Sequence, residues 1–155
     1  MTAADVIEAA IASGKTIATA ESCTGGGVGK DLTSVSGASN VFNGGIIAYS
    51  NDAKIRLLDV SQPLLDKYGA VSERVAECMA LGARNALGSD VAVSITGIAG
   101  PSGGSVEKPV GTVWIGVSSD VETKAYHNLF QGDREAVRSA SVKAALGHLY
   151  RAVRI

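Results

Sequence analysis

The sequence predicts an α/β protein, a three-layer α/β/α sandwich with a mixed, mostly parallel central sheet. Apolar, β-branched runs alternate with segments of helical periodicity along most of the chain. Two of these runs, residues 112–117 and 123–130, are separated by a short polar turn near Ser119 and predict an antiparallel hairpin. The 155 residues, 46% of them hydrophobic, suffice for a single domain over residues 1–155 with a core that needs no disulfides.

The individual elements follow from spacing and from residues typical of helix ends. Helices are expected at 3–13, 28–35, 51–58, 62–68, 72–87 and from Asp133 to the C-terminal region. Strands are expected at 16–20, 46–49, 91–96, 112–117 and 123–130. Gly14 can end the first helix, and Asn51, Ser72 and Asp133 are the expected N-caps. The buried face of helix 72–87 is predicted to carry Val75, Met79, Ala83 and Ala86.

Charge and composition exclude several classes of function. The net charge is -1, and the basic residues are scattered, which argues against nucleic acid as the main partner. Two cysteines and two histidines show no metal-ligand spacing, so no metal is expected. No apolar stretch approaches the roughly 20 residues of a membrane helix, and the first residues do not resemble a signal peptide. A cytoplasmic protein without membrane contact is therefore expected.

The first candidate for chemistry is the segment Glu21-Ser22-Cys23-Thr24-Gly25-Gly26 between a strand and a helix. A hydroxyl at such a turn is displayed beyond the sheet edge, and glycines let backbone N–H groups converge on an oxyanion. The alternative is a tight turn in which Ser22 or Thr24 only caps the helix. Sequences typical of a P-loop, an α/β-hydrolase elbow or a dinucleotide fingerprint are each incomplete here. Cys23 could itself be a nucleophile, but strand alternation predicts that it points into the core.

Lys54 is the second candidate, because it lies one turn into a helix that follows a strand. A cation is disfavoured near a helix N-terminus, so the pKa of this lysine is expected to be lowered, and a neutral amine can act as a base. The alternative is an ordinary exposed lysine.

A third candidate is the glycine-rich loop from Thr96 to Gly104, which includes Gly97 and Gly100. Backbone N–H groups of such a loop can hold a phosphate or a ribose, although a long mobile connection is the alternative. Arg134, at the start of the last helix, could add a guanidinium to a phosphate site, or could be simply exposed.

Together these segments resemble the nicotinamide mononucleotide deamidase family, also known as the C-terminal domain family of the competence/damage-inducible protein CinA, in its stand-alone form. The resemblance extends from about Ile7 to Leu149 and is carried by six blocks in order: TAESCTGG, YSNDAK, GAVS, TGIAGP, KPVGTV and GDR.

The resemblance implies hydrolysis of nicotinamide mononucleotide to nicotinate mononucleotide and ammonia, without a cofactor or metal, by a protein that self-associates. It places the nucleophile at Ser22 and the base at Lys54. Substrate-positioning roles are implied for Ser39, Tyr49, Thr96 and Arg134, and backbone N–H groups from Thr24 to Gly26 are expected to hold the oxyanion. A nucleotide-binding or regulatory module with little catalysis remains the alternative, and a nucleic-acid role is disfavoured by the charge.

Overall fold

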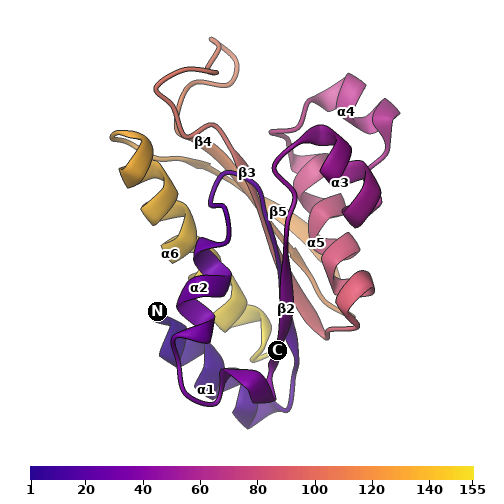
Figure 1. The fold of residues 1–155 in the computed structure, drawn as a ribbon, viewed down its shortest axis with the longest axis vertical. Coiled ribbons are helices and arrows are strands. Elements are labelled where there is room, and N and C mark those ends of the chain that lie inside the picture. Colours follow the sequence, from indigo (N-terminus) through magenta and orange to yellow (C-terminus); the bar gives the residue numbers. More distant parts are fainter.

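The computed structural model describes all residues from 1 to 155 and shows a five-stranded sheet between two layers of helices (Figure 1). The strands are β1 (Ile17–Glu21), β2 (Phe42–Ile47), β3 (Val91–Gly97), β4 (Thr112–Ser118) and β5 (Thr123–Leu129), arranged in the order β2-β1-β3-β4-β5. The β2–β1 and β1–β3 pairs are parallel, and the β3–β4 and β4–β5 pairs are antiparallel. Only β4 therefore runs against the other strands, and the predicted mixed α/β/α sandwich is confirmed.

The helices divide between the two faces of the sheet (Figure 1). One face is covered by α1 (Ala3–Ser13), α2 (Gly27–Thr33) and α6 (Arg134–Ala152), and the other by α3 (Asn51–Leu58), α4 (Gln62–Tyr68) and α5 (Glu73–Leu87). A short 3-10 helix, η1 (Ala38–Asn40), precedes β2. No helix has both the length and the apolar character needed to cross a membrane.

Strand alternation separates the core into two clusters. On β1, Ile17 packs in the cluster shared with α1, α2 and α6, whereas Ala18 and Ala20 pack in the cluster beneath α3, α4 and α5. Every residue of β1 is buried. The residue that follows β1 therefore leaves the sheet from its centre, with helices on both sides.

Several element ends differ slightly from expectation. The N-cap of α3 is Ser50 and not Asn51, since the Ser50 hydroxyl accepts the Ala53 N–H. Ser72 and Asp133 are N-caps as predicted. Ala86 is exposed, because the buried face of α5 ends at Ala83.

The strand expected at 46–49 instead begins at Phe42 and ends at Ile47. Gly44 and Gly45 lie inside it, and glycine is normally depleted in strands, which conceals the strand in the sequence. The structure explains Gly45 by its neighbour: a Cβ there would meet the Thr19 hydroxyl on β1.

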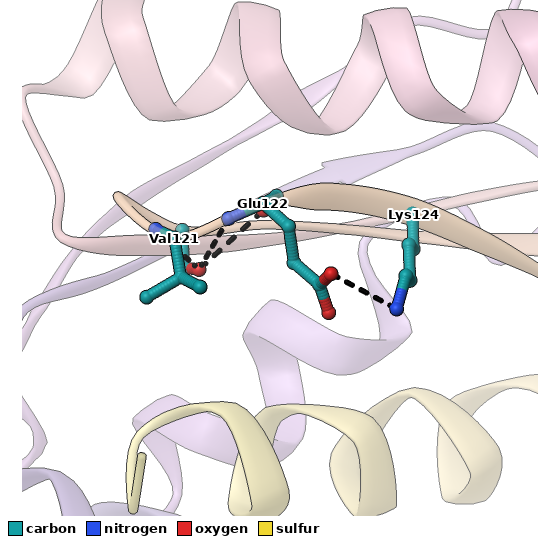
Figure 2. A network of polar contacts seen from close by, with 4 residues as sticks. Val121, Glu122 and Lys124 are labelled. Atoms are coloured by element: carbon teal, nitrogen blue, oxygen red, sulfur yellow. Dashed lines mark hydrogen bonds and ion pairs between the residues drawn. The ribbon is translucent and has the colours of Figure 1, made fainter.

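The predicted turn between β4 and β5 lies at Ser119, whose hydroxyl accepts the backbone N–H groups of Val121 and Glu122 at 3.2 and 3.4 Å. Figure 2 shows these contacts and the exposed ion pair between Glu122 and Lys124, which are 2.9 Å apart. The β4–β5 hairpin forms the edge of the sheet that lies away from β1.

Candidate active site

A cavity of about 270 Å³ opens at the carboxyl ends of β1 and β3. From β1 the chain continues to β2 on one side and later returns to β3 on the other, so this is the point at which the strand order reverses. Ligands of open α/β sheets bind at such switch points. The cavity is lined by Ser22, Cys23, Tyr49, Asn51, Lys54, Ala70, Val71, Thr96, Gly97, Ala99 and Arg134.

Ser22 and Lys54 meet in this cavity, although 32 residues separate them in the sequence. Ser22 follows Glu21 at the end of β1, and alternation turns its side chain to the face that also holds Ala18 and Ala20. Lys54 extends from the first turn of α3 on that same face, and its Nζ lies 3.0 Å from the Ser22 Oγ. The structure thus brings a hydroxyl and an amine into direct hydrogen-bond contact.

The surroundings of Lys54 favour the neutral amine. The side chain is 1% exposed and forms no ion pair, and its burial lowers the pKa of the ammonium from the usual value. Its Nζ donates to the carbonyl oxygens of Ala48 and Tyr49, both at 3.0 Å. Carbonyl oxygens only accept, so in the neutral amine they take both hydrogens and the lone pair is left to accept the Ser22 hydroxyl, whereas in the ammonium the third hydrogen is donated to the Ser22 Oγ. This arrangement suits a base that removes the Ser22 proton.

The N-terminus of α2 is not free to act on the site. The carboxylate of Glu21, which is 2% exposed, accepts the N–H groups of Val28 and Gly29 at 2.9 and 3.1 Å. It also accepts the Thr24 hydroxyl at 2.7 Å. The positive end of the helix is therefore occupied by Glu21, a role not predicted from the sequence. The available signal was a carboxylate at the end of the strand that leads into a helix, since carboxylates are favoured at a helix N-terminus.

The turn that follows Ser22 contains residues that line two different hollows. Thr24, Gly25 and Gly26 line a second groove of about 460 Å³, which they share with α6, and not the cavity of Ser22. The Gly25 N–H is already bound to the Ser22 carbonyl at 3.1 Å. No backbone oxygen of the protein accepts the N–H groups of Cys23, Thr24 or Gly26. Of the expected oxyanion donors, Thr24 and Gly26 therefore remain available, and Cys23 is added.

Thr96 lies beside Ser22 on the neighbouring strand. Glu21 pairs with Ile95 in the β1–β3 register, and the Ser22 N–H donates to the Ile95 carbonyl at 3.0 Å. The Thr96 hydroxyl, 1% exposed, donates to the Ala70 carbonyl at 2.8 Å. Its hydrogen is thus used, and its oxygen can only accept from a ligand.

Arg134 reaches the cavity from the start of α6. It donates to the Gly100 carbonyl at 2.8 Å and lies 3.4 Å from the Tyr49 hydroxyl. Gly97 lines the same cavity, and Gly100 is joined to it through Arg134. Arg134 thus gives the cavity a guanidinium held by two contacts.

Ser39 does not reach this cavity, unlike Tyr49, Thr96 and Arg134, the other residues expected to position the substrate through their side chains. It belongs to η1, which precedes the start of β2, and Phe42 of β2 pairs with Ile17 at the start of β1. Ser22 follows the other end of β1, so the length of the sheet separates the two serines. Ser39 lines a separate exposed hollow.

Cys23 points into the core, as alternation predicts. It is 6% exposed and packs in the cluster beneath α2 and α6, and burial raises the pKa of its thiol to about 11. A protonated, buried thiol is a poor nucleophile. No three His, Cys, Asp or Glu side chains gather in a way that could hold a metal ion.

Comparison with known proteins identifies the family of the chain. The sequence model of the CinA C-terminal domain family matches residues 1–153. The chain is 51% identical over 144 residues to a protein of Enterobacter agglomerans named nicotinamide-nucleotide amidohydrolase PncC, covering 92% of this chain and 86% of that protein. It is 47% identical over 142 residues to a CinA-like protein of Petrotoga mobilis, covering 92% of this chain but only 35% of that relative.

Solved structures show the same fold. The competence damage-inducible protein A of Klebsiella pneumoniae superposes with a TM-score of 0.92 at 35% identity, covering 96% of this chain and 92% of that one. The competence/damage inducible protein CihA of Agrobacterium tumefaciens gives a TM-score of 0.89 at 38% identity, covering 97% and 96%. The chain belongs to the CinA C-terminal domain family.

Proposed function

We propose that this protein hydrolyses the carboxamide of nicotinamide mononucleotide to nicotinate mononucleotide and ammonia, with Ser22 as nucleophile and Lys54 as base. The observation that carries the proposal is the 3.0 Å contact between the Ser22 hydroxyl and a buried lysine whose hydrogens are bound to two carbonyls. The relative named nicotinamide-nucleotide amidohydrolase supports the choice of substrate.

In the proposed mechanism the neutral Lys54 amine accepts the Ser22 proton while Oγ attacks the carboxamide carbon. The oxygen that becomes negative is stabilised by the N–H groups of Cys23 and Thr24. Protonated Lys54 then gives its proton to the departing amine, and the carbon–nitrogen bond breaks to release ammonia. Water cleaves the resulting Ser22 ester by the same proton transfers, which frees the carboxylate product and restores the serine.

The remaining groups of the cavity orient the substrate. The Thr96 oxygen can accept a hydrogen from the carboxamide nitrogen, because its own hydrogen is bound to Ala70. The guanidinium of Arg134 is suited to bind the phosphate of the substrate. Because the phosphate and the amide belong to one molecule, binding of the phosphate helps to hold the amide against Ser22. A substrate role for Ser39 would require a second copy of the chain, which the expected self-association would allow.

The test is release of ammonia from nicotinamide mononucleotide by the purified protein. Ser22→Ala and Lys54→Met are expected to lower kcat by at least about 10⁴-fold with the fold intact by circular dichroism. Lys143→Met is the matched control, because Lys143 is an exposed lysine on α6. Cys23→Ala is expected to retain turnover, since the thiol faces the core.

Two results would count against the proposal. Substantial turnover by Ser22→Ala would remove the serine mechanism. Binding of nicotinamide mononucleotide by the wild-type protein without ammonia release would instead favour a binding or regulatory module.

A further inference from the structure

Arg138, on the second turn of α6, contacts the backbone of the turn that follows Ser22. Its Nε donates to the Cys23 carbonyl at 3.1 Å, and its Nη2 donates to the Thr24 carbonyl at 3.4 Å. Glu135 and Asp31 line the same groove, yet Arg138 forms an ion pair with neither. The guanidinium is thus directed at two consecutive carbonyls of the chain that carries the proposed nucleophile.

Because peptide groups are planar, these two contacts also fix the direction of the neighbouring N–H groups. A carbonyl and the N–H of the following residue share one plane and point in opposite directions. With the Cys23 carbonyl held towards α6, the Thr24 N–H points away from α6, towards the face on which the Ser22 side chain lies. The next peptide behaves in the same way, because the Thr24 carbonyl faces Arg138 while the Gly25 N–H donates to the Ser22 carbonyl.

The turn is therefore held from two sides. Glu21 binds the Thr24 hydroxyl from within the sheet, and Arg138 binds the two carbonyls from α6. A lysine could not replace the arginine fully, because only the planar fork provides two donors in fixed positions. A positive charge on the carbonyl side also polarises the peptides and strengthens their N–H groups as donors.

We infer that Arg138 is a positioning residue, which aims the Thr24 N–H at the oxygen that becomes negative when Ser22 attacks its substrate. The inference rests on the proposed serine mechanism. Arg138 lines the neighbouring groove and not the Ser22 cavity, so it acts through the backbone and not on the substrate. Its removal should affect the transition state more than binding of the ground state.

The experiment compares kcat and KM for ammonia release in wild type, Arg138→Met and Arg138→Lys. Loss of a single oxyanion donor typically lowers kcat by about 100-fold, which is the effect expected for Arg138→Met, with KM within about threefold of wild type. Arg138→Lys keeps the charge but has a single donor nitrogen in place of the two that bind the carbonyls, and it is expected within about tenfold of wild type. Arg151→Met, at the exposed far end of α6, is the control and should match wild type.

A second readout separates this inference from the choice of substrate. A fluorophosphonate probe phosphonylates an activated serine through a similar negatively charged oxygen, and intact mass gives the labelling rate of Ser22. Ser22→Ala should abolish the labelling, and Arg138→Met should slow it by about 100-fold. If wild type is labelled but releases no ammonia, the substrate proposal fails, and the labelling rates alone decide the role of Arg138.

The inference is overturned if Arg138→Met keeps kcat and the labelling rate within about threefold of wild type, or if the loss appears in KM alone. Thermal unfolding of each variant checks that the fold is intact. If Arg138→Met fails to fold, Arg138→Gln, which removes the charge but keeps a donor, is judged by the same two criteria.

Discussion

Gly82 lies where α5 approaches the end of α3, and substituting it can displace Lys54 without replacing any residue that lines the cavity. A Cβ at Gly82 would lie 2.1 Å from the Leu58 carbonyl oxygen, whereas real Cβ atoms essentially never approach closer than 3.0 Å. Gly82→Ala must therefore move the end of α3 by about 1 Å. Lys54 lies one turn earlier on the same helix, and its Nζ has only 3.0 Å to Ser22.

The expected magnitudes follow from that displacement. A misplacement of about 1 Å can lower the rate about 100-fold, so kcat for ammonia release should fall by that factor. Overpacking costs about 2 kcal/mol, and the higher helix propensity of alanine offsets about 1 kcal/mol. The free energy of unfolding, measured in urea, should therefore fall by about 1 kcal/mol.

Gly147→Ala is the matched control, because Gly147 also lies inside a helix. A Cβ there meets only the Arg151 guanidinium, at an ordinary 3.7 Å. This variant should keep full activity and gain about 1 kcal/mol of stability, since nothing opposes the propensity gain. The reasoning is refuted if Gly82→Ala keeps kcat within about threefold of wild type, or if the two variants change stability equally.

Three further predictions concern single groups of the site. Arg134→Ala should raise KM for nicotinamide mononucleotide by about tenfold or more and leave nicotinamide riboside nearly unaffected; equal effects on both would remove the phosphate role. Burial lowers the pKa of Lys54, and only its neutral form is a base, so kcat/KM should rise with pH through that lowered pKa. Stability should rise over the same range, because there the unfolded chain binds a proton that the native state lacks; Lys54→Met should flatten this dependence. Glu21→Gln should lower the free energy of unfolding by about 1–3 kcal/mol, because an amide cannot accept from Thr24, Val28 and Gly29 with both of its polar atoms; chemical denaturation at neutral pH would show it.

The layers and most elements could be predicted because apolar periodicity reports burial directly. The fully buried β1 and the amphipathic α5 are the strongest examples. The start of β2 could not be predicted, because Gly44 and Gly45 are poor strand residues locally and Gly45 is required by Thr19 on the neighbouring strand. Local propensity contains no information about such cross-strand contacts.

In the candidate site, too, some features could be predicted from the sequence and others could not. Strand alternation and chain order suffice to place Ser22 and Thr96 together at one edge of the sheet. The role of Arg138 depends on contacts with particular backbone atoms of a turn, which no residue pattern predicts. Ser39 is the opposite case, since its implied role came from resemblance alone and the chain places it at the far end of the sheet.

Lys54 is anchored by main-chain oxygens. A mutation of the surrounding side chains can therefore change which amides bind without changing the position of the proposed base. Tyr49 offers its carbonyl to the lysine and its hydroxyl to Arg134, so replacing its ring leaves the first contact in place. The side chain at position 49 can therefore diversify during evolution while proton transfer is conserved, whereas Ala48 is held by the core. A scaffold of this kind can acquire new amide preferences without rebuilding its chemistry.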